Sequence, residues 1–332
     1  MTNATKEFFK NRRTAVKALA GALAMTMLPV RSFAAVKNVV AATGIDAYFS
    51  AFPVAAAQGF MKPENVNFTV RSFEFGGIAL DALLTHDAHV GSSSPVTAMT
   101  RWDHGGRIYT VGALSTSGTS YGATASERVK KPEDLYGKSV AFPALSSGQY
   151  FYEAFLKKYN LDGGKIQARS LPPAEALVAL QRGDVDAFFT WEPWNSRAAT
   201  TVKGAHTLVV SQDLGIDFVM YLYFSDQLVA DKALSQDVMG GLIEASNWVV
   251  KNPDQTVDIL YKSFRLPKAD STRQLQGLKF DMSMKKQPVI DDFNEFAGFA
   301  LRTKMIKNRP DWNEMMRPEI MKAVAPQLVS GW

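Results

Sequence analysis

Residues 171–194 read LPPAEALVALQRGDVDAFFTWEPW, and this stretch decides the fold. Paired prolines open a segment with helical spacing, and a glycine at position 183 closes it. The apolar run that begins at Ala187 is typical of a buried strand, and an aromatic–acid–proline–aromatic tetrad follows where that strand should end. Ligands of open α/β sheets lie just beyond the carboxyl ends of strands. Trp191 and Glu192 are therefore candidates for contact with a ligand.

The same alternation extends through most of the chain. From Val36 onward, short apolar runs alternate with helical periods, as in βαβ units with a mainly parallel sheet. The alternation forms two successive blocks, and we interpret the apolar run 218–224 as a connection between the two halves. Beyond Asp231 the periods are helical only. The pattern predicts an α/β protein of two lobes, each a mainly parallel sheet flanked by helices, with a helical C-terminal tail packed around the first lobe.

Charge is distributed unevenly along the 332 residues, which carry a net charge of +5. Residues 1–34 contain six lysines and arginines and a single glutamate, so residues 35–332 are neutral overall. A nucleic-acid-binding face would need clustered lysines and arginines. The composition therefore argues against nucleic acid as a partner.

The first 34 residues have the layout of an export signal. A basic region runs to Lys17, an apolar run covers 18–28, and small residues precede a cleavage site after Ala34. Arg12 and Arg13 resemble a twin-arginine motif, and an ordinary Sec signal with paired arginines is the alternative. The chain has no cysteine, which excludes a disulfide, a thiolate metal site and a lipid anchor. We expect a protein free in the periplasm.

Small residues gather at three turns between a predicted strand and a predicted helix, at positions 76–77, 92–94 and 146–148. Helix N-termini expose free N–H groups and carry a partial positive charge. Serine and glycine add donors without bulk, so these turns can hold a small anion without lysine or arginine. Serine also caps helices whatever the function, so simple capping is the alternative at each turn.

Aromatic residues near the predicted strand ends complete the candidate site. Tyr48, Phe75 and Trp191 are the ones that we favour as walls for an organic ligand, although most aromatics in any chain are core. Glu192 could accept a hydrogen bond from a ligand amine or hydroxyl, or it could hold a helix N-terminus.

Signs of catalysis are weak. His86 and His89 lie three residues apart with no nearby third ligand, which argues against a metal site. The sequence has no nucleophile elbow, P-loop or dinucleotide-binding fingerprint. Acid–base chemistry by a pair of carboxylates is left open by the sequence. We expect no catalytic residue, no metal and no cofactor.

Several of these motifs together resemble a known family. Residues 172–177, 183–187 and 191–194 look like those of the solute-binding proteins of nitrate, sulfonate and taurine ABC importers, a family that also includes binders of thiamine precursors and aromatic acids. Residues 131–141 are similar to the family's entry into its second domain, and residues 90–95 resemble the taurine-type turn. The resemblance covers roughly residues 37–225.

The resemblance implies a type II periplasmic binding protein, in which two crossing strands join two lobes around a ligand cleft. It implies an export signal at 1–34, a first lobe of 35–121 plus 223–332, and a second lobe of 122–222. Such a protein is a monomer without catalytic activity. It captures a small organic anion, alkyl sulfonate or taurine-like or nitrate-like, and delivers it to an inner-membrane permease driven by a cytoplasmic ATPase.

Other functions remain open at this point. They are a binder of an aromatic carboxylate, an amine or a thiamine precursor, an enzyme similar to pyrimidine-precursor synthases, and a sensor that presents ligand to a membrane receptor. The loop 44–50 matches no substrate class, and no arginine stands obviously in a cleft position to grip a sulfonate. The cleft positions implied by the resemblance are Tyr48, Phe75, Gly76, Gly77, Ser93, Ser94, Ser146, Ser147, Gln149, Trp191 and Glu192.

Overall fold

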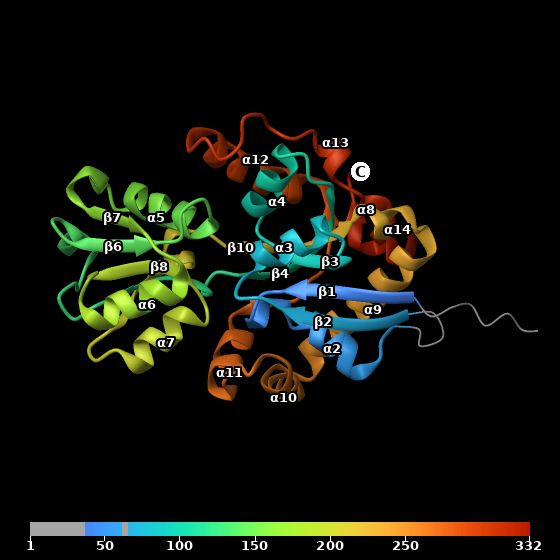
Figure 1. The fold of residues 1–332 in the computed structure, drawn as a ribbon, viewed down its shortest axis with the longest axis horizontal. Helices are drawn as coiled ribbons and strands as arrows, with labels where there is room; N and C mark the ends of the chain where they lie inside the picture. Colours follow the sequence, from blue (N-terminus) through green and yellow to red (C-terminus); the bar gives the residue numbers. More distant parts are fainter. Residues whose placement is uncertain (1–36, 62–65) are drawn as a thin grey trace, which may run out of the picture. The chain divides into compact units, whose positions relative to one another are not determined.

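The computed structural model describes residues 37–61 and 66–332 (Figure 1). The predicted export signal, 1–34, lies outside the described residues. Within the described ranges, a six-stranded sheet and a five-stranded sheet organise the chain, together with a small two-stranded sheet. Helices flank both large sheets, so the α/β prediction is confirmed (Figure 1). The prediction that each sheet is mainly parallel is wrong, because the strands next to the crossings, Tyr121–Ala125 and Phe218–Ser225, pair antiparallel with both of their neighbours and make both sheets mixed.

The six-stranded sheet has the order β11-β4-β10-β3-β1-β2. β1 pairs in parallel with β2 and β3, while β10 is antiparallel to both β3 and β4, and β11 is antiparallel to β4. The bounds are β1 (Lys37–Thr43), β2 (Val66–Ser72), β3 (Val90–Ser93), β4 (Ile108–Ser117), β10 (Phe218–Ser225) and β11 (Leu278–Lys279).

The run that we interpreted as a connection is a strand inside this sheet. β10 lies between β3 and β4, and all but one of its residues are buried. A strand that is covered on both faces reads as a continuous apolar run, without the alternation that marks a half-exposed strand. The interpretation of 218–224 as a connection is therefore incomplete, because the run also closes the first sheet.

The five-stranded sheet has the order β7-β6-β8-β5-β9. β6 is parallel to β7 and β8, and β5 is antiparallel to β8 and β9. The bounds are β5 (Tyr121–Ala125), β6 (Ser139–Phe142), β7 (Gln167–Ser170), β8 (Ala187–Trp191) and β9 (His206–Val210). Its helices are η2 (Pro132–Leu135), α5 (Ser147–Lys158), η3 (Gly163–Lys165), α6 (Pro173–Arg182), α7 (Trp194–Thr201) and η4 (Ser211–Leu214).

The stretch 171–194 folds as its sequence predicts. α6 begins at Pro173, where the missing proline N–H costs the helix nothing. It ends at Gly183, whose φ of 78° is the left-handed conformation that favours glycine at a helix end. β8 then runs from Ala187 to Trp191 with four of its five residues buried, and it delivers Trp191 to the end of the strand.

The remaining helices cover the first sheet, and most of them belong to the C-terminal tail (Figure 1). α9 packs on α2, α12 packs on α4, and α14 packs on β4. In the described part of the chain, no helix is long and apolar enough to cross a membrane. The elements are η1 (Ala47–Phe49), α2 (Ala51–Gln58), α3 (Gly76–Leu84), α4 (Pro95–Asp103), α8 (Asp226–Ala230), α9 (Lys232–Lys251), α10 (Pro253–Phe264), α11 (Lys268–Gln276), β12 (Met284–Lys285), α12 (Lys286–Arg302), α13 (Trp312–Met315), α14 (Pro318–Val324), η5 (Pro326–Leu328) and β13 (Val329–Ser330).

The chain passes between the large sheets after β4 and again before β10, and these two crossings lie against each other. Gln212 N and Ser211 Oγ both donate to Gly118 O, at 2.7 and 2.8 Å. The ring of Tyr121, the first residue of β5, stacks on the ring of Phe218, the first residue of β10, with centroids 3.7 Å apart. The two crossings therefore form one packed junction beside the strand ends.

Candidate functional site

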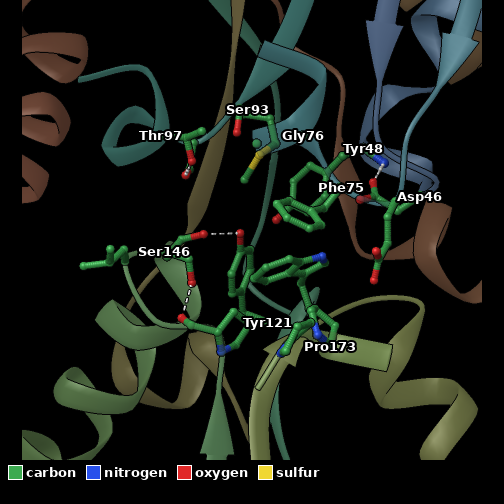
Figure 2. Close-up of a pocket in the computed structure, with 18 of the residues that line it drawn as sticks. Asp46, Tyr48, Phe75, Gly76, Ser93, Thr97, Tyr121, Ser146 and Pro173 are labelled. Carbon is green, nitrogen blue, oxygen red and sulfur yellow. Dashed lines mark hydrogen bonds between the residues drawn. The ribbon is translucent and has the colours of Figure 1, made fainter. Parts of the chain in front are cut away.

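A pocket of about 400 Å³ lies where the strand ends of the two large sheets meet (Figure 2). Its walls come from both sheets, and each contributes loops that follow a strand and open a helix. The lining residues from the first sheet and its helices are Asp46, Tyr48, Phe49, Glu74, Phe75, Gly76, Gly77, Ser93, Ser94, Thr97, Arg101 and Met220, and those from the second are Tyr121, Pro143, Ala144, Leu145, Ser146, Ser147, Ser170, Pro172, Pro173 and Trp191.

Helices α3, α4 and α5 begin at this pocket, as their turn sequences predict. Phe75 precedes α3 and Ser94 precedes α4, and neither side chain caps its helix. Ser146 does cap α5, because its Oγ accepts a hydrogen bond from Gly148 N at 3.1 Å and donates one to Pro143 O at 2.6 Å. The starts of α3 and α4 therefore offer N–H groups and the positive ends of helix dipoles to a bound anion.

Aromatic rings form the second feature of the pocket. Phe75 and Trp191 come from different sheets, and their rings meet edge-on with centroids 6.2 Å apart. Tyr121 lies beside Trp191 at 5.8 Å, and its hydroxyl shares a 2.7 Å hydrogen bond with Ser147 Oγ. The hydroxyl of Tyr48 points instead toward the carbonyl of Phe218, 3.3 Å away. Rings in this arrangement can bury an organic ligand from both sides of the pocket.

A buried carboxyl, Asp46, also lines the pocket. Its side chain opens η1, where Oδ1 accepts a hydrogen bond from Tyr48 N at 2.7 Å. Asp46 is only 6% exposed. This burial raises the pKa of Asp46 to about 8, and the nearby carboxyl of Glu192 acts in the same direction. The group is therefore largely protonated at neutral pH when the pocket is empty.

An arginine does reach the pocket, which corrects the expectation that none stands in a cleft position. Arg101 lies on α4, and its guanidinium binds both carboxylate oxygens of Asp81 at 2.9 and 3.0 Å. It also donates to Gly77 O at 3.0 Å. A bidentate pair of this kind uses much of the guanidinium's charge and donors. The sequence does carry a signal, since Thr97 and Arg101 follow Ser94 at helical spacings of three and seven residues.

The structure brings most of the sequence-predicted site residues together and leaves two away from the pocket wall. Gln149 accepts a hydrogen bond from Leu145 N at 2.9 Å and donates one to Glu153 at 3.1 Å, so it holds the turn before α5. Glu192, which precedes α7, accepts a hydrogen bond from Ser196 N of that helix at 3.1 Å. Their role as ligand contacts stays a prediction, as it does for the predicted residues that line the pocket: Tyr48, Phe75, Gly76, Gly77, Ser93, Ser94, Ser146, Ser147 and Trp191.

Other lining residues were not singled out from the sequence. Asp46 lies in a loop that matched no substrate class, and Tyr121 faces the pocket only because β5 runs antiparallel beside β8. The described residues contain no group of three or more histidines, cysteines or acids that could hold a metal ion. His89 serves the fold instead, because its Nδ1 accepts a hydrogen bond from Val40 N at 3.1 Å.

Comparison with known proteins identifies the family and the fold of this chain. Residues 46–256 match the family model described as NMT1/THI5 like, which covers more than half of the chain. The chain belongs to the NMT1/THI5-like family. The taurine-binding periplasmic protein of Escherichia coli K12 is 30% identical over 149 residues, which are 43% of this chain and 46% of that protein. The match thus spans less than half the length of that relative.

Solved structures share the fold of this NMT1/THI5-like protein at low sequence identity. The alkanesulfonate-binding protein of Xanthomonas axonopodis pv. citri, bound to MOPS, superposes with a TM-score of 0.72 and 21% identity over 86% of this chain and 99% of its own. The likeness confirms the predicted type II periplasmic binding-protein fold. The desulfurization enzyme DSZB also shares this fold, with a TM-score of 0.66 and 13% identity over 88% of this chain and 99% of its own. The fold alone therefore does not separate binding proteins from enzymes.

Proposed function

We propose that this chain is the substrate-binding component of an ABC importer and that it captures a small organic anion, alkyl sulfonate or taurine-like or nitrate-like. The observation that carries the proposal is the pocket between the two sheets, where the uncapped starts of α3 and α4 meet aromatic rings from both sides. The names of the taurine-binding relative and of the alkanesulfonate-binding structure point to the same chemistry.

Capture follows from the way the pocket is built. An anion is stabilised by N–H groups and helix dipoles at α3 and α4, while the rings of Phe75 and Trp191 exclude water from both sides. The packed junction of the two crossings, where Tyr121 stacks on Phe218, would act as the hinge about which the two lobes open and close. The solute shifts the balance toward the closed form only by its higher affinity for that form.

The proposal includes a place and partners. We place the mature protein in the periplasm as a monomer with lobes divided near residues 121 and 223, and we assign its export to the segment 1–34. Closed lobes would present the surface that an inner-membrane permease reads before a cytoplasmic ATPase drives uptake. We expect the solute to leave unaltered, because the taurine-binding relative and the alkanesulfonate-binding structure are both named as binding proteins.

The aromatic rings are also compatible with a second class of solute. Phe75, Tyr121 and Trp191 could enclose the flat ring of an aromatic carboxylate, an aromatic amine or a thiamine precursor. Native mass spectrometry of the protein purified from its own periplasm separates these candidates, because the mass of a co-purified molecule identifies its class. Turnover of that molecule by the purified protein would contradict the transport proposal and favour an enzyme.

Replacing Trp191 by alanine tests the wall of the pocket. If Trp191 covers the solute, calorimetry should show a loss of about 1–3 kcal/mol of binding free energy with the fold retained. Trp194 is the matched control, since it lies three residues further along, at the start of α7 and outside the pocket lining, with Arg197 over its ring at 5.0 Å. Trp194→Ala should bind like the wild type. Equal affinities for the wild type, Trp191→Ala and Trp194→Ala would show that Trp191 does not contact the solute.

A further inference from the structure

We propose that the solute carries an ammonium group as well as an oxyanion group, and that Asp46 binds the ammonium. The inference deepens the proposed function and rests on it. Figure 2 shows Asp46 on one side of the rings of Tyr48 and Phe75, and Ser93, Thr97 and Ser146 on the other side of the view. The pocket thus has an acidic end and an end rich in hydroxyl groups and helix starts.

The hydrogen bonding of Asp46 leaves room for a ligand. One carboxyl oxygen, Oδ1, accepts from Tyr48 N at 2.7 Å, and the structure gives no hydrogen bond to Oδ2. The residue is 6% exposed and lines the pocket. A carboxyl oxygen at a pocket wall can accept further hydrogen bonds from a bound group. An ammonium group in the pocket supplies up to three donors.

The charges on the pocket wall favour a cationic partner at this end. Among the described lining residues the acids are Asp46 and Glu74, and the only cation is Arg101. Asp81 already holds that guanidinium through both carboxylate oxygens. An anion alone would therefore meet the acid Glu74 and a protonated Asp46, with no free cation among these lining residues. An ammonium group at Asp46 offsets the acidic end while the helix starts receive the oxyanion.

The rings next to Asp46 add to the attraction. Tyr48 follows Asp46 in η1, and Phe75 and Trp191 line the same pocket with their rings in contact. Aromatic faces attract ammonium groups, most strongly where water is excluded. A carboxyl group that shares its pocket with these rings is therefore better suited to an ammonium than to the chain of a simple alkyl anion.

The protonation of Asp46 should make the binding of an ammonium solute depend on pH. Burial raises the pKa of Asp46 to about 8, with Glu192 adding to the rise, and an ammonium would lower that pKa again by stabilising the carboxylate. The hydroxyls of Tyr48 and Tyr121 interact electrostatically with this carboxyl, and Glu74 lines the same pocket. Arg273 and Asp270 of α11 lie near Glu192. Binding of an ammonium solute should release a proton below about pH 8.

The experiment uses matched pairs of probes that differ only in the amine. They are 2-aminoethanesulfonate with ethanesulfonate, and 3-aminopropanoate with propanoate, each titrated calorimetrically into the wild type, Asp46→Asn and Asp281→Asn. At least one amine should bind about tenfold to a hundredfold more tightly than its amine-free partner, and Asp46→Asn should remove that preference. The exposed Asp281 lies outside the pocket, so Asp281→Asn should keep the preference.

The wild type provides a second measurement that needs no variant. From pH 6 to 8 the affinity for the amine should rise, by up to about tenfold per pH unit, because less work is needed to deprotonate Asp46. If Asp46 instead donates its proton to an anion, the affinity should stay level and then fall above about pH 8.

The outcomes separate the two levels of the proposal. Binding of ethanesulfonate or propanoate without any preference for the amine, or an amine preference that survives in Asp46→Asn, overturns the role of Asp46 and leaves the importer function standing. Failure of the folded wild type to bind any of the four probes overturns the small-oxyanion function and this inference with it.

Discussion

Replacing Gly76 by valine should abolish solute capture. A Cβ at this position would lie 2.7 Å from the backbone oxygen of Ser92 and 3.1 Å from Ser93 Oγ. Because a backbone oxygen in a buried strand cannot rotate away, either α3 or β3 must shift. Phe75 and Ser93 would move with them. We expect the unfolding free energy to fall by about 3 kcal/mol. Affinity should fall by about a hundredfold, equivalent to two lost hydrogen bonds to a charged ligand.

Gly240 offers a matched control for this substitution. It lies inside α9, and a Cβ built there meets no atom within 4 Å. Valine is no worse than glycine in a helix interior, so Gly240→Val should keep both stability and affinity. Urea unfolding and calorimetry on the two variants give the comparison. Wild-type affinity in a folded Gly76→Val protein would show that the start of α3 does not hold the solute.

The turns of the pocket could be predicted because their chemistry is local. A glycine or serine between a strand and a helix frees N–H groups wherever the chain folds, so Gly76, Ser94 and Ser146 are readable from the sequence alone. The same holds for the end of α6 at Gly183, where a left-handed conformation selects glycine. Each of these features depends on its immediate neighbours in the chain.

The acidic end of the pocket could not be predicted, because it depends on contacts between distant segments. Asp46 acquires its raised pKa only when the packed fold removes water and brings Glu192 near, 146 positions along the chain. Likewise, the guanidinium of Arg101 is less available to bind an anion, because it is already paired with the carboxylate of Asp81 on α3. Spacing along α4 places Arg101 on the right face, but only the tertiary structure shows its partner.

The inner strand of the first sheet shows the same limit. The apolar run that begins at Phe218 has no alternation, so nothing in the sequence tells whether it crosses between lobes or lies between two strands. The structure shows that it does both, since its first residue stacks on Tyr121 at the junction and the rest pairs with β3 and β4. The sequence therefore predicts the crossing between the lobes but not the pairing of this run within the first sheet.

Replacing Asp292 by asparagine should change how stability depends on pH. Asp292 lies on α12, and its Oδ2 is buried without a hydrogen-bond partner. Burial raises its pKa from 3.8 to about 7, although a hydrogen bond with Tyr221 acts in the opposite direction and Glu295 adds to the rise. The folded protein therefore keeps a proton that the unfolded chain loses between about pH 4 and 7. Folding must then favour the protonated form, and stability falls as the pH rises through this window.

The asparagine variant cannot ionise, so its stability should lack this part of the slope. Each unit of pKa shift corresponds to about 1.4 kcal/mol. The unfolding free energy of Asp292→Asn should therefore exceed that of the wild type by at most about 4 kcal/mol at pH 8, and the two should differ little at pH 4. Asp291 is the matched control, because it is the exposed neighbour on the same helix and accepts a hydrogen bond from Gln287 at 2.8 Å. Asp291→Asn should follow the wild-type curve in urea unfolding from pH 4 to 8. Parallel curves for Asp292→Asn and the wild type would mean that Asp292 already has its charge stabilised in the folded protein.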